Sequence, residues 1–202
     1  MIEIPVELRF KGDRTYLHGT DVYASAVDCL QQRWPGIEGR CRFSFHRVTS
    51  HPVLALLDSF QNGRSKPENC VADMHLTGGK NEASIWFVER EGAIAGRYAY
   101  DEDAVVKDCI VSGSCISRAG SSHYSTIETI VAMTKRLHNV VALPAQGKWL
   151  FTRLDLKRLL RARDAEELSV TLAGEPKASL TRSNIAVHGE QLGSIFFSIG
   201  RP

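Results

Sequence analysis

The chain has 202 residues, with 25 lysines and arginines, 23 aspartates and glutamates, and 43% hydrophobic residues. That length allows one large core or two smaller cores, and the composition is typical of a globular chain rather than a disordered one. A net charge of +2 gives no strong field for nucleic acid or an anionic membrane surface. The chain has no run of 18 apolar residues and no basic N-terminal segment. We therefore expect neither a transmembrane helix nor a secretory signal.

The cysteines do not form a recognisable framework. They number five, an odd count, and no C-x-x-C pair occurs among Cys29, Cys41, Cys70, Cys109 and Cys115. We expect all five to be small buried apolar side chains in a reduced, cytoplasmic protein.

A zinc site is not indicated by spacing either. His46 and His51 are five positions apart, and no cysteine or acid stands in ligand spacing beside them. No metal and no cofactor is expected.

The first half of the chain predicts one helix among strands. Residues 5–10 read as a short extended stretch, and a helical apolar period follows over 22–34, with Thr20 or Asp21 as its N-cap. The sequence Trp34-Pro35-Gly36 ends this helix. Alternation of apolar and polar residues predicts strands afterwards. Their predicted ranges are 41–46, 70–76, 83–90 and 93–100, with 59–69 as a loop.

The second half repeats this order. Residues 105–116 read as extended, and 126–138 predict a helix with Ile127, Ile130, Val131 and Leu137 on one side. Strands are predicted at 148–156 and 168–172. A final hairpin is predicted over 177–187 and 190–199, turning at 188–189.

The two halves suggest an internal repeat. Residues 14–34 match 119–139 at an offset of 105, and Gly92 and Gly96 correspond to Gly189 and Gly193. A chance alignment of two halves remains the alternative, because hairpins commonly place glycine at turns. We predict an α+β protein of two units, residues 1–104 and 105–202, each with one helix against an antiparallel sheet.

One long helix wrapped by an antiparallel sheet, used twice, resembles the hotdog superfamily in its tandem, double-hotdog form. The segment from Tyr16 to Tyr23 includes His18 and Gly19 and leads into the first helix, which carries Asp28. It resembles the His-Gly start of the central helix in hotdog thioesterases. That resemblance implies that Gly19 donates a backbone N–H to the thioester carbonyl. It further implies that His18 orients the thioester or acts as acid or base, and that Asp28 is the general base.

Two features qualify these roles. Here a single glycine follows the histidine, and Asp28 stands ten residues after His18, about one more than in the compared pattern. Asp28 also lies opposite the apolar helix face, where an ordinary solvated carboxylate is the alternative. Asp21 is the second carboxylate candidate, since Thr20-Asp21 resembles part of the 4-hydroxybenzoyl-CoA thioesterase pattern. Its alternative role is to cap the helix.

The second half supplies further candidates. His123 aligns with His18 at the 105 offset. Hotdog dehydratases pair a histidine with a helical acid, so His123 with Asp28, or His18 with Glu128, are cross-pairs that the resemblance suggests. Glu128 has a surface role as its alternative. The extended His-Phe-x-x-x-Pro-x-x-Pro-Gly loop of bacterial acyl-carrier-protein dehydratases is not present in the chain.

These observations lead to one expected function and two alternatives. We expect an enzyme that hydrolyses an acyl thioester of coenzyme A or of acyl-carrier protein. The alternatives are a dehydratase or hydratase of β-hydroxyacyl and enoyl thioesters, and a non-catalytic binding protein. The expected substrate-binding residues are Gly19, Tyr23, Ser122 and Glu128.

A basic cluster is either a solvated face or a binding site for coenzyme A phosphates or an acidic carrier. It consists of Arg153, Lys157, Arg158, Arg161 and Arg163. Exposed sheet edges leave homodimerisation open.

Overall fold

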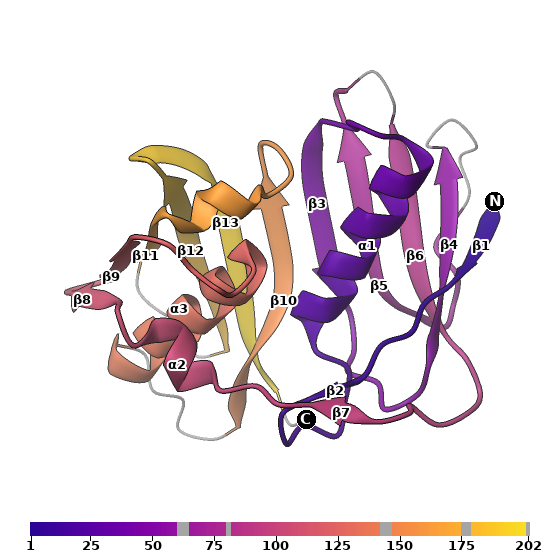
Figure 1. The fold of residues 1–202 in the computed structure, drawn as a ribbon, viewed down its shortest axis with the longest axis horizontal. Helices are drawn as coiled ribbons and strands as arrows, with labels where there is room; N and C mark the ends of the chain where they lie inside the picture. The colour runs from indigo at the N-terminus through magenta and orange to yellow at the C-terminus, as the bar shows by residue number, and fades with distance from the viewer. Residues whose placement is uncertain (60–64, 80–81, 142–146, 175–178, 201–202) are drawn as a thin grey trace. The chain divides into compact units, whose positions relative to one another are not determined.

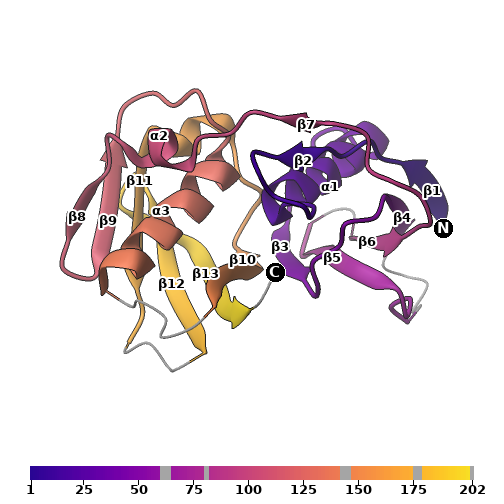
Figure 2. The same cartoon turned by 90° about the horizontal axis from the view of Figure 1, so that it is seen from below.

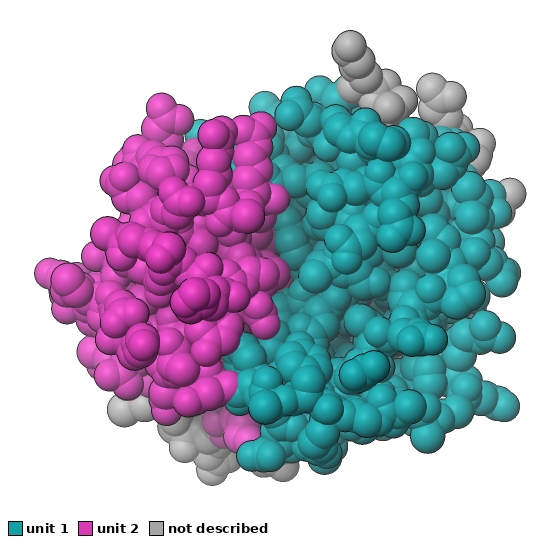
Figure 3. Space-filling model, in the orientation of Figure 1, with its two compact units in different colours: residues 1–100, 157–159 teal, residues 101–156, 160–202 magenta. Residues whose placement is uncertain are grey.

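The computed structural model describes residues 1–59, 65–79, 82–141, 147–174 and 179–200. The chain divides into two compact units, residues 1–100 with 157–159 and residues 101–156 with 160–202 (Figure 3). Within the described residues, every helix is too short or too polar to span a bilayer.

The first unit is one helix against a five-stranded antiparallel sheet (Figure 1). Its strands follow the order β1-β4-β6-β5-β3 across the sheet. A separate pair of very short strands, β2 and β7, runs parallel. The elements are β1 (Ile2–Pro5), β2 (Phe10–Lys11), α1 (Gly19–Arg33), β3 (Arg40–Phe45), β4 (Val53–Ser59), β5 (Cys70–Thr77), β6 (Ala83–Glu89) and β7 (Arg97–Tyr98).

The helix α1 forms because its apolar residues share one stripe. Val22, Ala26 and Leu30 are fully buried, as the helical period predicts. Tyr23 packs edge-on against Phe43 of β3, with ring centroids 5.5 Å apart. The face of β3 with Phe43 is therefore the face that α1 covers.

The second unit also sets one long helix against an antiparallel sheet (Figure 2). Its strands follow the order β10-β13-β12-β11-β9-β8. The elements are α2 (Glu102–Val106), β8 (Ile110–Ser112), β9 (Cys115–Ala119), α3 (Thr126–Val141), β10 (Lys148–Leu156), the 3-10 turn η2 (Ala162–Ala165), β11 (Glu167–Leu172), β12 (Leu180–Val187) and β13 (Glu190–Gly200).

The core of the second unit includes an unusual histidine at the end of α3. His138 is completely buried, with its ring 4.8 Å from the ring of Trp149 and 5.2 Å from that of Phe197. Among the described residues, neither ring nitrogen has a hydrogen-bond partner. Burial lowers the pKa of His138 to about 4, so this side chain is neutral at physiological pH.

Several predicted elements are confirmed. The strand at 148–156 matches β10, and the alternation of Cys41, Phe43 and Phe45 matches the buried positions of β3. The last hairpin turns at His188 and Gly189, whose φ angles are 50° and 76°. Two left-handed central residues fit the right-handed twist of the strands on either side. The start of this hairpin at 177–178, and part of the loop at 59–69, lie outside the described residues.

Three predicted stretches are only partly confirmed. The extended stretch at 5–10 contains the last residue of β1 and the first of β2, and the strand at 93–100 is reduced to β7. The extended stretch at 105–116 includes β8 and the start of β9, but it begins inside α2. Asp101 caps α2 by accepting from the backbone N–H groups of Asp103 and Ala104. This cap and the acids of the first turn outweigh the β-branched valines that follow.

The cysteines are also less uniform than expected. All five are free thiols; Cys29, Cys41 and Cys70 are buried, whereas Cys109 and Cys115 are half-buried. The prediction of burial is therefore confirmed for Cys29, Cys41 and Cys70 only.

Candidate functional site

The N-terminus of α1 is the centre of the predicted site, and it starts earlier than the sequence suggested. The N-cap is His18, neither Thr20 nor Asp21, and its backbone is extended with φ −84° and ψ 134°. The preceding residue anchors this loop, because the Leu17 N–H donates to the Thr49 carbonyl at 2.8 Å. His18 itself is only 7% exposed, which makes it a fixed part of the helix start.

No side chain caps this helix. Asp21 N–H and Val22 N–H both donate to the His18 carbonyl. Within the part of the chain that the structure describes, the N–H groups of Gly19 and Thr20 have no acceptor. Both residues are buried. Buried backbone donors are nearly always paired, and here they coincide with the positive end of a helix dipole.

The side chains around this helix start form a polar cluster. His18 Nδ1 lies 2.7 Å from Thr20 Oγ1. Lys11, which is completely buried, donates from Nζ to Thr20 Oγ1 and to Asp21 Oδ1, each at 3.0 Å. Tyr98 donates its hydroxyl to Asp21 Oδ2 at 2.7 Å. This cluster therefore joins β2, β7 and the first turn of α1.

Lys11 is held from a second side by an aromatic ring. Its ammonium lies 4.3 Å from the centroid of the Tyr100 ring, and the His18 and Tyr100 ring centroids are 6.4 Å apart. A cation over an aromatic face is attracted by the ring quadrupole. Lys11, Tyr98 and Tyr100 were not predicted as site residues. Position 11 reads as a turn by composition, and only the pairing of β2 with β7 brings it under α1.

The two candidate carboxylates of α1 have different surroundings. Asp21 does not cap the helix as its alternative role required; instead it accepts hydrogen bonds from Lys11, Thr20 and Tyr98. Asp28 is exposed and stands seven positions later, about 10 Å further along the helix axis. The structure thus brings His18, Gly19 and Asp21 together and leaves Asp28 two turns away.

The start of α3 differs from that of α1. Glu128 Oε2 accepts from the backbone N–H of Ser125 at 2.9 Å, and Ser125 Oγ accepts from the Glu128 N–H at 3.4 Å. This reciprocal pair is a capping box. At the start of α3, side chains thus accept from the backbone N–H groups of Ser125 and Glu128. At the start of α1, the N–H groups of Gly19 and Thr20 have no acceptor among the described residues.

The candidate histidines consequently occupy different positions in the two units. His123 is exposed and precedes α3, which begins at residue 126, whereas α1 begins at residue 19. The helix starts differ by 107 positions rather than 105, so Ser125 corresponds to His18 in structure. The cross-pairs of His123 with Asp28 and of His18 with Glu128 join residues of different units, and they stay predictions.

The remaining candidates have local structural partners. Tyr23 packs in the core against Phe43, and Ser122 accepts from the Tyr124 N–H at 3.1 Å. In the basic cluster, Arg153 is ion-paired with Asp155, whereas Lys157, Arg161 and Arg163 are exposed. No substrate role is tested by these contacts.

Comparison of the sequence with protein-family profiles and with curated proteins gives no match. Solved structures do match over most of the chain. The tesB protein of Mycobacterium avium subsp. paratuberculosis gives a TM-score of 0.54 at 12% identity, with 97% of this chain and 91% of that chain covered. A protein assigned as thioesterase II from Thermobifida fusca gives 0.52 at 9% identity, with 98% and 92% covered.

A dehydratase domain of a trans-AT polyketide synthase from Brevibacillus brevis gives a TM-score of 0.51 at 9% identity, with 92% of this chain and 86% of that domain covered. At such identities the likeness shows a shared fold. A long helix against an antiparallel sheet, together with likeness to these structures over nearly the whole chain, shows that this chain has the hotdog fold.

Proposed function

We propose that this protein is an enzyme that hydrolyses an acyl thioester of coenzyme A or of acyl-carrier protein. We further propose that its two units, residues 1–100 with 157–159 and residues 101–156 with 160–202, are tandem hotdog repeats. Support for the repeat comes from the use of one long helix and one antiparallel sheet in each unit. Support for the substrate class comes from the fold likeness to proteins named as thioesterases and from the helix start described above.

The observation that carries the proposal is the pair of N–H groups at the buried residues Gly19 and Thr20. A carbonyl oxygen bound there would accept a hydrogen bond from a donor that has no other acceptor among the described residues. Negative charge develops on that oxygen when a thioester is attacked. A fixed donor at a helix N-terminus stabilises such charge without reorganisation.

The side chains beside these donors give the other roles. A water molecule attacks the thioester carbon, and its proton passes to the Asp21 carboxylate. The C–S bond then breaks, and the leaving thiolate takes a proton from Nε2 of the His18 imidazolium, whose Nδ1–H donates to Thr20 Oγ1 because the Thr20 hydroxyl donates to Asp21. The products are a free acid and a thiol, and a proton exchanged with solvent restores both side chains.

Asp21 is favoured over Asp28 as the base within the first unit. A general base must lie within hydrogen-bond reach of the water that it activates, and Asp28 lies about 10 Å further along the helix axis. We retain Asp28 and His123 as catalytic candidates, and Tyr23, Ser122 and Glu128 as substrate-binding candidates, to be decided by substitution.

A second candidate reaction is dehydration of a β-hydroxyacyl thioester. It is favoured by the three hydrogen bonds that Asp21 already accepts, which engage both of its carboxylate oxygens; His18, at the same helix start, would then be the acid–base group. His18 would take the α-proton as the β-hydroxyl leaves as water, protonated by a carboxylic acid. The enoyl thioester would remain intact.

The two reactions are separated by their products. Purified protein is incubated with acyl- and β-hydroxyacyl-thioesters of coenzyme A and of acyl-carrier protein, and the products are identified by mass spectrometry. We expect a free acid and a thiol. Loss of water with an intact thioester would replace hydrolysis by dehydration. Unchanged thioesters that nevertheless raise the melting temperature would show a binding protein.

A further inference from the structure

A histidine, a cysteine and an aspartate meet on the sheet of the first unit, on the face away from α1. Phe43 marks the face that α1 covers, and its strand neighbours Ser44 and His46 point to the opposite face. Ser44 is paired with Asp73 of β5. Directly paired residues share a face, so Asp73 lies on the face away from α1 with His46.

A β-bulge brings the cysteine to the same face. Residues three apart on a regular strand point to opposite sides, so Cys70 and Asp73 would not meet. The pairing of β5 with β6 shifts between Cys70 and Ala72. Cys70 is opposite Val88 and Asp73 is opposite Trp86, and these two partners are themselves two apart on β6. Bulges of this kind re-aim a side chain at specific sites.

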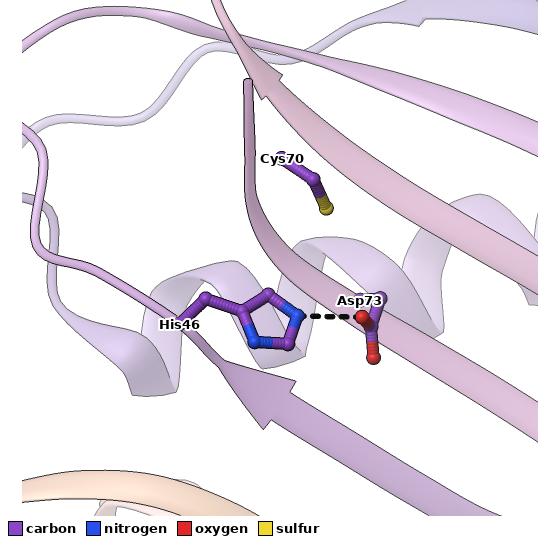
Figure 4. A group of neighbouring side chains, drawn as sticks. All are labelled: His46, Cys70 and Asp73. Carbon is purple, nitrogen blue, oxygen red and sulfur yellow. Dashed lines mark hydrogen bonds and ion pairs between the residues drawn. The ribbon is translucent and has the colours of Figure 1, made fainter. Parts of the chain in front are cut away.

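The three donor atoms converge (Figure 4). His46 Nε2 lies 2.6 Å from Asp73 Oδ2, and one donor atom of each of the three residues lies within 4.8 Å of the other two. Cys70 and Asp73 are each 5% exposed, whereas the His46 side chain is 31% exposed. The cluster is therefore buried on the β5 side and open to solvent on the His46 side.

A second histidine lies beside the carboxylate. His75 Nε2 lies 3.5 Å from Asp73 Oδ1, and His75 Nδ1 is 2.7 Å from Ser84 Oγ. Asp73 therefore lies between His46 and His75. Neighbours of a ligating carboxylate commonly help to position it at metal sites.

We propose that His46 Nε2, Cys70 Sγ and a carboxylate oxygen of Asp73 form a binding site for a zinc-class divalent cation, with a fourth position open to solvent. A thiolate, an imidazole and a carboxylate are all ligands of tetrahedral zinc, with bond lengths that place donor atoms about 3.3–3.7 Å apart. Mixed sulfur and nitrogen donors favour such ions over magnesium and calcium. The His46–Asp73 contact needs to open by only about 1 Å to admit the ion.

The Cys70 thiol must lose its proton when it binds the cation. Its Sγ donates to the Ala72 carbonyl at 3.1 Å. An incoming cation replaces this proton, which is released to solvent as the metal–sulfur bond forms.

The site joins two adjacent strands at one end. The His46 N–H donates to the Val71 carbonyl at 2.8 Å, directly after β3 and inside the bulge of β5. A cation here would tie the end of β3 to the start of β5 and so stabilise the first unit. It lies on the face opposite α1, and the inference is therefore independent of the thioester reaction proposed above.

Sequence spacing could not have revealed this group. His46 is 24 positions from Cys70 and 27 from Asp73, and only the strand pairing with its bulge brings them together.

Cobalt binding tests the site, because Co²⁺ replaces zinc and reports its ligands by colour. Protein dialysed against a chelator is titrated with Co²⁺, and Zn²⁺ is then added to displace it. We expect one equivalent to bind with a thiolate-to-cobalt charge-transfer band and the visible bands of a four-coordinate ion. Absence of the charge-transfer band in the wild-type protein would overturn the proposal.

Variants assign the band to these residues. Cys70→Ser should abolish the charge-transfer band, and His46→Ala, at an exposed position that tolerates truncation, should weaken binding by more than about a hundredfold. His51→Ala and Cys115→Ser are matched controls, and each should bind as the wild type does. Circular dichroism confirms folding of each variant. A band that persists in Cys70→Ser, or wild-type affinity in His46→Ala, would contradict the assignment.

Discussion

The buried ammonium of Lys11 lies 3.0 Å from the carboxylate of Asp21, in the first turn of α1. Lys11 is completely enclosed, whereas the Asp21 side chain is 14% exposed. The ion pair thus joins a two-residue strand to the helix start, where the N–H groups of Gly19 and Thr20 have no acceptor among the described residues. Its integrity should affect both stability and any chemistry at this helix start.

Removal of the Lys11 ammonium should lower the free energy of unfolding. Lys11→Met leaves the Asp21 carboxylate without its buried partner, and we expect a loss of about 3 kcal/mol in the free energy of unfolding. Urea denaturation measures the loss, and Lys66→Met, at an exposed position of the same unit, is the control. The double variant Lys11→Met/Asp21→Asn should lose less than the two single variants together. Simple additivity would show that the pair is not coupled.

Substitution of the two carboxylates of α1, Asp21 and Asp28, should affect turnover differently. Asp21→Asn should lower turnover strongly, whereas Asp28→Asn, which changes an exposed side chain, should leave it within about threefold. Steady-state rates on the substrate found in the thioester panel measure this difference. If Asp28→Asn were the inactive variant, the base would be Asp28 and the first-turn assignment would be wrong.

Glu128 offers a test of capping against substrate binding. Glu128→Ala removes the capping box of α3 and should cost about 1 kcal/mol of stability. Glu128→Gln can still form the box and should be nearly neutral. Thermal unfolding and KM are measured together for both variants. An increase in KM for Glu128→Gln without loss of stability would support the predicted role in substrate binding.

The buried His138 predicts a loss of stability in acid. The folded-state pKa of about 4 lies below the ordinary value of 6.5, so between these values the unfolded chain binds more protons than the folded one. The contribution of this residue is therefore complete above pH 6.5 and is lost as the pH falls toward 4. Its size is at most about 3 kcal/mol.

Substitution isolates that effect. His138→Phe should flatten the dependence of unfolding free energy on pH between 6.5 and 4, because phenylalanine does not titrate. His188→Asn, at an exposed hairpin position, should leave the dependence as in the wild type. An unchanged slope in His138→Phe would assign the acid sensitivity to other groups.

The sequence predicts what depends on local pattern. The apolar period that buries Val22, Ala26 and Leu30, the alternation in β3 and the turn at His188 and Gly189 are readable because neighbouring residues determine them. The stretch containing α2 is misread, since its valines favour a strand while Asp101 caps a helix.

The site is less predictable, because most of its contacts join residues that are far apart in the sequence. His18 and Gly19 are recognisable because both lie where a helix begins. Lys11 joins them only through the pairing of β2 with β7, and Cys70 reaches Asp73 only through a one-residue bulge. A shift of one residue in register reverses the face of a side chain, and no local pattern encodes it.

The central claim is that the Gly19 N–H polarises a thioester carbonyl, and proline can remove that single donor. Gly19 is the first residue of α1, where proline fits a helix without breaking it, and the extended backbone of His18 suits a residue before proline. Gly19→Ala keeps the N–H and controls for added bulk. Circular dichroism verifies that both variants fold.

The decisive measurement is therefore kcat for Gly19→Pro and Gly19→Ala on the preferred thioester. We predict that Gly19→Pro loses about 10²–10³-fold in kcat, the usual effect of deleting one such donor, while Gly19→Ala retains most of its activity. Wild-type turnover in a folded Gly19→Pro protein would contradict the account.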